Sequence, residues 1–336
     1  MDNILRKASS IGLVLVLMAT IFVSFPVVSA PPDKCEPWPE CKDGEEPQAD
    51  PEIVFYVQTP QARHPNRIMV MNADGSNQAV IYEEFFVLNG LSWSPDGSSL
   101  AWSGHLETGP TWEYGIWRID VEIADGEPQG TNLLQLVSHA DCEICFSAAW
   151  SPLGDEIAYV IHTYDGEIDE FGINAIPATG GTPYNIHTAP DGYGLTHGLA
   201  WSSDGTQLAA VGGELPAGYD GMGIEIIDRE TGTVTHRLLT GQFRFQGLDW
   251  ARQSSNTVLF HDSGGSGLIY TVDIDSGTAN PVVEGCCASW SPDNSKVVYL
   301  QPGNRPDRRI ISIYDLSTEE ITELRQGGSR PDWRRF

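Results

Sequence analysis

Three histidines of this 336-residue chain stand at nearly the same distance after a tryptophan. His105 and His162 each follow a tryptophan by twelve residues, and His261 follows one by eleven. Neutral imidazoles, together with a carboxylate, are suitable ligands for a divalent transition metal, which could polarise an acidic sugar or lower the pKa of a bound water. With His197 they form the candidate metal-binding set, and the cofactor they indicate is a divalent metal ion. The alternative is that they are scattered surface histidines.

Motifs of the common catalytic classes are missing. The sequence has no G-x-S-x-G of a serine hydrolase, no H-E-x-x-H of a zincin and no P-loop. We therefore name no catalytic residue, leave open whether the chain is an enzyme, and favour a binding protein.

Aromatic residues lie in several long segments that are rich in glycine and acidic residues. Exposed aromatic rings in such segments can stack on a ligand or anchor a protein partner. The candidate ligand-binding residues are Phe86, Trp112, Tyr164, Tyr193 and Tyr219. The alternative is that individual rings fold back and pack within their loops.

The six cysteines come as close pairs, namely Cys35 with Cys41, Cys142 with Cys145, and Cys286 beside Cys287. In a secreted chain, proximity favours three local disulfides. Cys142 and Cys145 form a C-x-x-C, but no second pair accompanies it to complete a zinc site, and no thioredoxin-like unit surrounds it. A bridge between adjacent residues 286 and 287 needs an unusual backbone.

A repeated unit must position all of these residues. "LSWSPDGSSLAW" at 91, "AAWSPLGDEIAY" at 148 and "LAWSSDGTQLAA" at 199 are near copies, with further copies at 248, 288 and 330. The anchoring residues, 40 to 57 positions apart, are Trp93, Trp150, Trp201, Trp250, Trp290 and Trp333. A period of this length is typical of one four-stranded propeller blade.

Each unit reads as a strand, the Trp turn, a second strand, a loop, a third strand, a tight hairpin and a fourth strand. The last copy has only the first strand, whereas the segments at 52, 67 and 78 look like the three strands missing from it. The sequence thus predicts an all-β fold, a six-bladed β-propeller of four-stranded antiparallel blades, closed by the C-terminal strand joining the N-terminal blade.

Period-2 alternation assigns the faces of each first strand. The residues one and three before each tryptophan are small or polar and are expected to face a central channel, while the residue between them packs between blades. The long loops should share the face with the channel mouth, and binding is expected on this loop face. The "SPDG" segments are interpreted as turns, not as phosphate or metal loops.

The repeated "WSPDG", with "RIMVMNADGSN" as a preceding hairpin, resembles the TolB-type, WD-like β-propeller repeat of periplasmic proteins. The resemblance covers residues 52 to 336, which we assign to the propeller. It implies an envelope protein or polysaccharide as partner. The chain also resembles the propeller half of prolyl-oligopeptidase-type enzymes without their hydrolase half. The alternative function is a metal-dependent enzyme similar to propeller polysaccharide lyases, with a histidine site at the channel mouth.

Residues 1–30 combine Arg6 and Lys7 with an uncharged run and a small-residue cleavage pattern, as a signal peptide does. An uncleaved membrane anchor is the alternative. Residues 31–51 read as a Cys/Pro-rich acidic linker, and either alternative places the propeller in the periplasm or outside the cell. The formal charge of −27 disfavours nucleic acid and anionic lipid as partners.

Overall fold

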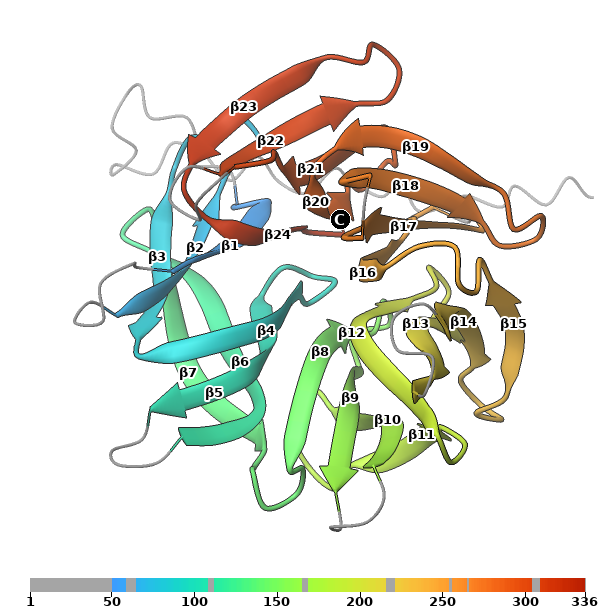
Figure 1. The fold of residues 1–336 in the computed structure, drawn as a ribbon. Coiled ribbons are helices and arrows are strands. Elements are labelled where there is room, and N and C mark those ends of the chain that lie inside the picture. The colour runs from blue at the N-terminus through green and yellow to red at the C-terminus, as the bar shows by residue number, and fades with distance from the viewer. Residues whose placement is uncertain are drawn as a thin grey trace, which may run out of the picture. The chain divides into compact units, whose positions relative to one another are not determined.

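The computed structural model describes residues 50–58, 65–107, 112–164, 169–215, 221–253, 256–264, 266–303 and 309–335. Their regular structure is almost entirely β, in six four-stranded antiparallel sheets arranged as the blades of a propeller (Figure 1). The predicted fold class is confirmed. The segment 1–30 and nearly all of 31–51 lie outside the described residues, as do Cys35 and Cys41.

The blades are numbered here from the N-terminus, and each is given from its innermost to its outermost strand. In blade 1 the innermost strand is the last strand of the chain. Blade 1 contains β24 (Ser329–Trp333), β1 (Ile53–Val57), β2 (Asn66–Met71) and β3 (Ala79–Glu84). Blade 2 contains β4 (Phe86–Trp93), β5 (Ser99–Glu107), β6 (Trp112–Ala124) and β7 (Glu127–Val137). Blade 3 contains β8 (Ile144–Trp150), β9 (Glu156–Tyr164), β10 (Asp169–Pro177) and β11 (Tyr184–Thr188).

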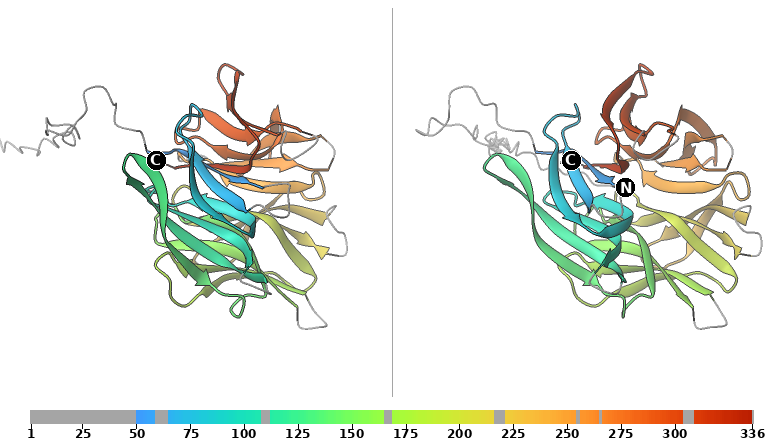
Figure 2. Two further views of the ribbon diagram at one scale, coloured as in Figure 1. Left: turned by 90° about the vertical axis from the view of Figure 1, so that its left-hand side faces the viewer. Right: turned by 60° about the vertical axis from the view of Figure 1, so that its left-hand side comes forward.

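The remaining three blades follow the same plan around the ring, as the side views also show (Figure 2). Blade 4 contains β12 (Tyr193–Trp201), β13 (Gln207–Glu214), β14 (Met222–Asp228) and β15 (Val234–Leu238). Blade 5 contains β16 (Phe245–Trp250), β17 (Thr257–Asp262), β18 (Leu268–Asp273) and β19 (Ala279–Glu284). Blade 6 contains β20 (Cys286–Trp290), β21 (Lys296–Leu300), β22 (Ile310–Asp315) and β23 (Ile321–Gln326).

Blade 1 joins the two ends of the propeller sequence. β24 pairs antiparallel with β1, with Trp333 opposite Ile53 and Asp332 opposite Val54. The C-terminal strand thus covers an edge of β1 that would otherwise carry unpaired backbone groups. This is the closure that the sequence predicts.

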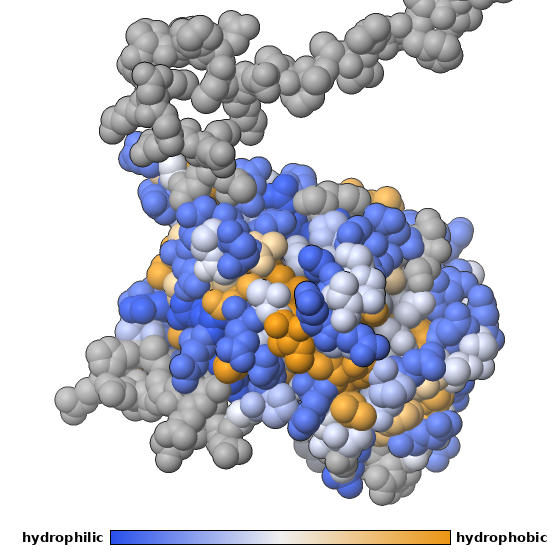
Figure 3. All heavy atoms as spheres, turned by 90° about the horizontal axis from the view of Figure 1, so that it is seen from above, coloured by the Kyte–Doolittle hydropathy of each residue, from blue (hydrophilic) through white to orange (hydrophobic). Residues whose placement is uncertain are grey.

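Apolar residues of neighbouring blades pack together to form the core. The largest cluster combines residues of blades 4, 5 and 6, including Trp250, Phe260 and Trp290. All six predicted blade tryptophans are buried, with at most 5% of their surface exposed. Each blade therefore depends on its neighbours to bury its own apolar face. The outer surface seen from above is mostly hydrophilic, with apolar side chains near the middle of that side (Figure 3).

The "SPDG" turns are held by their own side chains. In the turn between β4 and β5, the Asp96 carboxylate accepts hydrogen bonds from the Ser94 hydroxyl at 2.6 Å and from the Ser98 amide at 3.0 Å. Asp204 and Asp293 repeat this arrangement in blades 4 and 6. These carboxylates accept hydrogen bonds from the hydroxyl and amide groups of their own turns. The segments are therefore structural turns, as the sequence indicated.

Each innermost strand contains a bulge that the sequence alone did not reveal. The pairing register shifts near the middle of all six, for example between Cys286 and Ser289 of β20. At four of the six positions three before the tryptophan the backbone is left-handed, with φ of 58° at Ser147, 59° at Gly247 and at Cys287, and 50° at Arg330. A bulge interrupts strict alternation. The residues two before the tryptophan consequently pack against the inter-blade clusters and also border the channel, so the predicted separation of faces is too simple.

Hydrogen bonds between innermost strands connect successive blades around the channel. The residue before each tryptophan accepts a bond from the backbone N–H of the next blade's tryptophan at four of the six junctions. The acceptor–donor pairs are Asp332 with Trp93, Ser92 with Trp150, Asp249 with Trp290, and Ser289 with Trp333. Alanine stands before the tryptophan in blades 3 and 4 and offers no side-chain acceptor, although the Trp201 indole N–H instead binds the Ala149 carbonyl at 3.1 Å.

Candidate functional site

The innermost strands of all six blades enclose a central cavity of about 830 Å³. The residue preceding each blade tryptophan lines it, as the sequence predicts. These residues are Ser92, Ala149, Ala200, Asp249, Ser289 and Asp332. Polar groups of several blades thus converge on one space, which is the general character of a ligand site.

One end of the cavity is lined by polar side chains at the ends of the innermost strands, which we call the floor cluster: Asp249, Arg252 and Ser289, which are buried, and Asp332, which is partly buried. Arg252 donates to the Asp249 carboxylate at 2.6 Å and to the Ser289 hydroxyl at 2.9 Å, and its guanidinium lies 3.6 Å from Asp332. Arg252 is only 9% exposed. Burial raises the pKa of Asp332, and the charge of Arg252 opposes that change.

A second arginine, Arg335, lines the cavity near the floor cluster and is 8% exposed. Burial, and then the positive charge of Arg252, lower its pKa to about 9. The floor is therefore built from charged groups that are shielded from water on this side of the ring.

The opposite end of the cavity is accessible. Gln58 and Glu284 are exposed there, while Arg309 and Arg330 are partly exposed. These residues lie in or beside the long loops that connect the second strand to the third and the fourth strand to the next blade, so this end opens on the loop face. The cavity therefore has its mouth on the loop face and its charged floor on the opposite face, which carries the tight turns and which we call the turn face.

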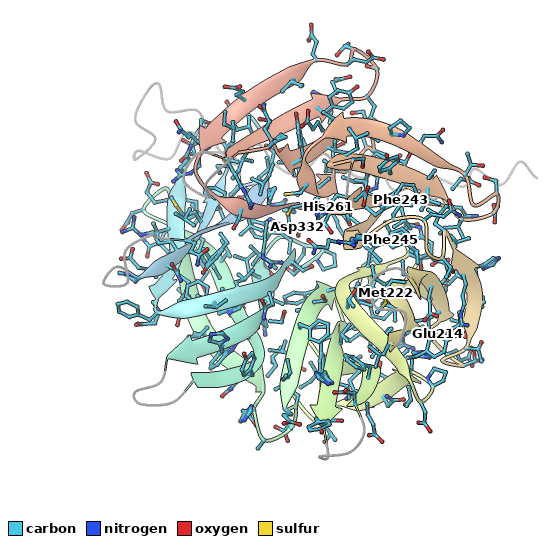
Figure 4. All side chains as sticks on the ribbon, viewed as in Figure 1. Glu214, Met222, Phe243, Phe245, His261 and Asp332 are labelled. Atoms are coloured by element: carbon cyan, nitrogen blue, oxygen red, sulfur yellow. A yellow bond between two sulfur atoms is a disulfide. The ribbon has the colours of Figure 1, made fainter. Side chains whose placement is uncertain are left out.

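Of the predicted metal ligands whose side chains are described, only His261 lines the cavity (Figure 4). It is 8% exposed, and its Nδ1 has no hydrogen-bond partner. Gly247 of the neighbouring strand lies beside it, and a Cβ added there would be in ordinary van der Waals contact with that nitrogen, at 3.6 Å. Burial lowers the pKa of His261 to about 4, although a hydrogen bond to the Gln246 backbone and the charge of Asp262 act in the opposite direction.

This lowered pKa predicts a specific pH dependence of stability. The folded protein holds His261 neutral, whereas the unfolded chain protonates it at the ordinary pKa of 6.5. The stabilisation is complete above that pH and is lost as the pH falls to about 4, a loss of about 3 kcal/mol at about 1.4 kcal/mol per pH unit. In denaturant titrations across this window, His261→Gln should show a correspondingly weaker acid destabilisation.

The matched control is His236→Gln, which changes an exposed histidine of β15 and should keep the acid destabilisation of the unaltered protein. Identical pH dependence in the unaltered protein and in His261→Gln would show that the buried imidazole is not the group responsible.

Two of the other predicted metal ligands, His105 and His162, do not join His261. His105 lies in β5 with its ring 4.8 Å from that of Tyr114. His162 lies in β9, stacks on Phe171 and contacts the Asp169 carboxylate at 2.7 Å. His197 lies in β12, and its side chain is not among those described. Among the described residues, no group of three or more His, Cys, Asp or Glu side chains is arranged to hold a metal ion.

A difference in register explains why the three aligned histidines separate. His105 pairs with Val87 and His162 with Ile144, each six positions before its blade's tryptophan, whereas His261 pairs with Gln246, four before. The residues paired with the blade tryptophans are Leu100, Ile157 and Val258, so His105 and His162 lie five residues beyond that pair and His261 only three. All three histidines are therefore on the same face of their sheets, and His261 lies two residues nearer the turn that follows the tryptophan.

The predicted aromatic ligand-binding residues fall into different environments. Phe86 is 1% exposed and packs against Tyr56 and Tyr82, so it is a core residue and not a stacking platform. Its position at the start of β4, directed inward between blades 1 and 2, is the reason. Tyr164 ends β9 and is 52% exposed. Tyr193 is partly buried beside a second, smaller cavity.

Tyr193 stacks with a cation at the edge of blade 4. The Arg237 guanidinium lies 4.9 Å from the centre of its ring and also donates to its hydroxyl at 3.1 Å. Arg237 in turn pairs with the buried Glu225 at 2.9 Å. Of the remaining two candidates, Trp112 begins β6 and its side chain is not described, and Tyr219 lies outside the described residues.

The cysteine pairs differ in state. Cys142 and Cys145 form the predicted disulfide, in the loop that leads into β8. Cys286 and Cys287 are free thiols whose sulfur atoms lie 3.2 Å apart, and both line the central cavity.

The sequence interpretation missed the arginines of the cavity. Arg252 belongs to the degenerate copy "LDWARQSS", in which Ala-Arg follows the tryptophan where three of the other units have Ser-Pro, and that departure from the repeat was the available sign. Arg309 and Arg330 gave no comparable sign, because they come together only through the pairing of blades 6 and 1.

Comparisons with known proteins agree on the architecture. No protein-family model and no curated protein matches the sequence. Among solved structures, TolB from Acinetobacter baumannii matches with a TM-score of 0.63 at 17% identity, over 85% of this chain and 67% of that one. A TolB of Agrobacterium tumefaciens matches with a TM-score of 0.55 at 20% identity, over 84% of this chain and 92% of that one.

An acylaminoacyl peptidase of Pyrococcus horikoshii matches with a TM-score of 0.50 at 14% identity, over 84% of this chain. The matched region is only 45% of the peptidase chain. At these identities the likeness concerns the fold, which is a TolB-like six-bladed propeller.

Proposed function

We propose that this chain is a protein-binding module of the cell envelope, in which the loop face docks the partner and the mouth of the central cavity receives a polar segment of it. The observation that carries the proposal is the shape of the cavity. It is accessible at the loop face and ends in a buried floor cluster of charged side chains. A closed floor with an open mouth suits insertion of a ligand from one side.

The chemistry of the mouth supports a peptide segment as the ligand. Arg309 and Arg330 supply positive charge, Glu284 supplies negative charge, and Gln301 carries an amide at the same opening. Protein backbones and side chains offer donors, acceptors and charges of both signs, so a mouth of mixed character can satisfy them. Among the described residues at this opening, Arg309 and Arg330 offset the charges of Asp262 and Glu284.

The turn face is less suited to binding, because its carboxylates are already engaged. Asp228, Asp273 and Asp315 each accept bonds from a hydroxyl and from backbone amides within their own hairpins. These contacts lower the pKa of each of the three carboxyl groups, in keeping with anions whose hydrogen-bonding capacity is used locally.

The location and partner class follow from the N-terminal sequence and the fold. Residues 1–30 have the pattern of an export signal or anchor, and the fold is TolB-like. We therefore place the propeller in the periplasm or outside the cell, with an envelope protein as partner. None of the described segments is a helix long and apolar enough to cross a membrane.

A pair of serine variants tests the proposal. Ser263 is exposed at the mouth and lines the cavity, whereas Ser317 is exposed in a hairpin of the turn face. The bulky Ser263→Trp should weaken partner binding at least about tenfold by obstructing the mouth, because most interface energy is concentrated in a few central contacts. Ser317→Trp, which likewise replaces a serine making one short hydrogen bond, should bind as the unaltered protein does.

The readout is capture of envelope proteins by the immobilised propeller, followed by affinity measurement with the purified partner. Equal capture by both variants, or loss only with Ser317→Trp, would contradict the assignment of the loop face. Retention of acidic polysaccharide without any protein would overturn the peptide ligand in favour of a carbohydrate.

A further inference from the structure

Two adjacent thiols lie in the wall of the central cavity. The sulfur atoms of Cys286 and Cys287, at the start of β20, are 3.2 Å apart. Both side chains are partly exposed and border the cavity, so a small solute entering from the loop face can reach them. Their sulfurs need to approach by only about 1 Å to reach bonding distance.

The backbone at this position lacks the regular strand pairing that would oppose a disulfide between the two cysteines. Cys286 pairs with Leu300 and Ser289 with Val298, which leaves the bulge residue Cys287 without a regular partner in the ladder. Cys287 already has a left-handed backbone, with φ of 59°. A disulfide between neighbouring residues requires an irregular backbone, and the bulge supplies one.

This pair is specific to blade 6. In the other innermost strands the residue three before the tryptophan, which is the position of Cys287, has different chemistry, namely Gly90, Ser147, Gly198, Gly247 and Arg330. The bulge therefore belongs to the scaffold, and only one blade places two thiols in it.

The surroundings activate one of the two sulfurs. The hydrogen bond with the Cys286 thiol, followed by the charges of Arg330 and Arg309, lowers the pKa of Cys287. The pKa of Cys286 is raised in turn, first by the same hydrogen bond and then by burial. A cysteine with a lowered pKa next to positive charge is the nucleophilic member of a reactive pair.

We propose that Cys286 and Cys287 form a thiol–disulfide exchange site that reacts with low-molecular-weight disulfides entering the cavity. The Cys287 thiolate attacks one sulfur of the disulfide RSSR, whose S–S bond breaks, and the released thiolate takes up a proton as RSH. The Cys286 sulfur then loses its proton and attacks the Cys287 sulfur, which displaces a second RSH. The protein dithiol is oxidised to a disulfide while RSSR is reduced to two RSH.

The charge of the mouth favours a particular class of disulfide. Arg309 and Arg330 border the cavity and act on the Cys287 sulfur, so carboxylate-bearing disulfides are attracted to the site. Oxidised glutathione, which carries carboxylates, is therefore the probe of choice.

The test equilibrates the full chain in mixtures of oxidised and reduced glutathione, blocks free thiols, and measures the tryptic peptide of residues 253–296 by mass spectrometry. No Lys or Arg lies between Arg252 and Lys296, so this peptide carries both thiols and no other cysteine. We expect it to pass from a dithiol to a form lighter by two hydrogen atoms as the mixture becomes oxidising. In the Cys286→Ser variant the reaction should stop after its first step, with glutathione bound to Cys287 as a mixed disulfide.

Two further measurements distinguish a reactive thiol pair from two cysteines that are merely adjacent. Arg330→Gln should slow alkylation of Cys287 near neutral pH by about three- to tenfold and move its pH profile upward, because a positive neighbour is lost. A trivalent arsenical, which bridges two thiols without closing the S–S bond, should bind the unaltered protein and neither single Cys→Ser variant. A pair that stays reduced in fully oxidised glutathione, or that binds no arsenical while folded, would overturn the proposal.

Discussion

A chain that lacks residues 330–336 is expected to lose its cooperative folding transition. The deletion removes most of β24, and with it the buried Trp333 and the hydrogen bond from the Trp93 amide to Asp332. Truncating one buried tryptophan alone costs about 3–5 kcal/mol, and a typical domain is stable by only about 5–15 kcal/mol. Loss of most of β24, with its contacts to β1 and to the neighbouring blades, should therefore cost as much free energy as the folded state has. Far-ultraviolet circular dichroism during thermal melting measures the outcome.

Trp333→Ala provides the graded comparison for this deletion. It removes one side chain but leaves the β24–β1 pairing in place, so the protein should remain folded with a lower Tm. A synthetic peptide of residues 329–336, added to the shortened chain, should restore part of the transition. Equal Tm values for the full and the shortened chain would mean that β24 does not close the ring.

Substitution of Arg252 by alanine should destabilise the protein by about 3–5 kcal/mol, the usual effect of removing one partner from a buried charge pair. The variant leaves Asp249 and Asp332 buried without the guanidinium that lies between them, 2.6 Å from the first carboxylate and 3.6 Å from the second. It also removes the donor to Ser289. Chemical denaturation near neutral pH gives the free-energy difference.

Arg67→Ala is the matched control for the floor cluster. Arg67 pairs with Glu83 at 2.6 Å, but the side chains are 42% and 38% exposed, and an exposed pair contributes about 0–1 kcal/mol. If both alanine variants lowered stability by the same small amount, burial of the floor cluster would not govern its energetics. A large loss confined to Arg252→Ala would establish the cluster as the support of the cavity floor.

Repetition made the fold predictable, whereas the site depended on local departures from the repeat. Six tryptophan copies and the incomplete last unit specify the blades and the closure, because each copy contains its own turn and strand pattern. The bulges could not be predicted from the sequence, because the alternation of residue types along a strand does not show where an extra residue is inserted. Their effect on the channel wall was therefore missed.

The histidine prediction shows the same limit at finer scale. Regular spacing suggested one metal site, yet the pairing of His261 with Gln246 differs from that of His105 with Val87 by two positions relative to the tryptophans. Spacing along the chain determines which strand carries a residue. The pairing register determines how far along the strand, and so how deep in the ring, the residue lies, and register depends on long-range contacts that a single sequence does not display.

Phe86 failed as a binding residue for a related reason. Its segment reads as a loop because charged residues precede it, but the chain has already entered β4 at this position, and the ring is buried between blades 1 and 2. Neighbouring blades decide whether an aromatic residue near a strand end is buried, and that information lies some 20 to 30 residues away in contacts such as that with Tyr56.

The pairing of β24 with β1 also dictates an order of events during synthesis. The Ser329 hydroxyl binds the Tyr56 carbonyl across 273 positions of sequence, so the first blade stays one strand short until the very end of the chain is available. Contacts of such long sequence separation form late in folding. Until then β1 presents a bare hydrogen-bonding edge to other chains. A nascent molecule is thus most prone to mispairing at its first blade, and the arrival of β24 ends that exposure.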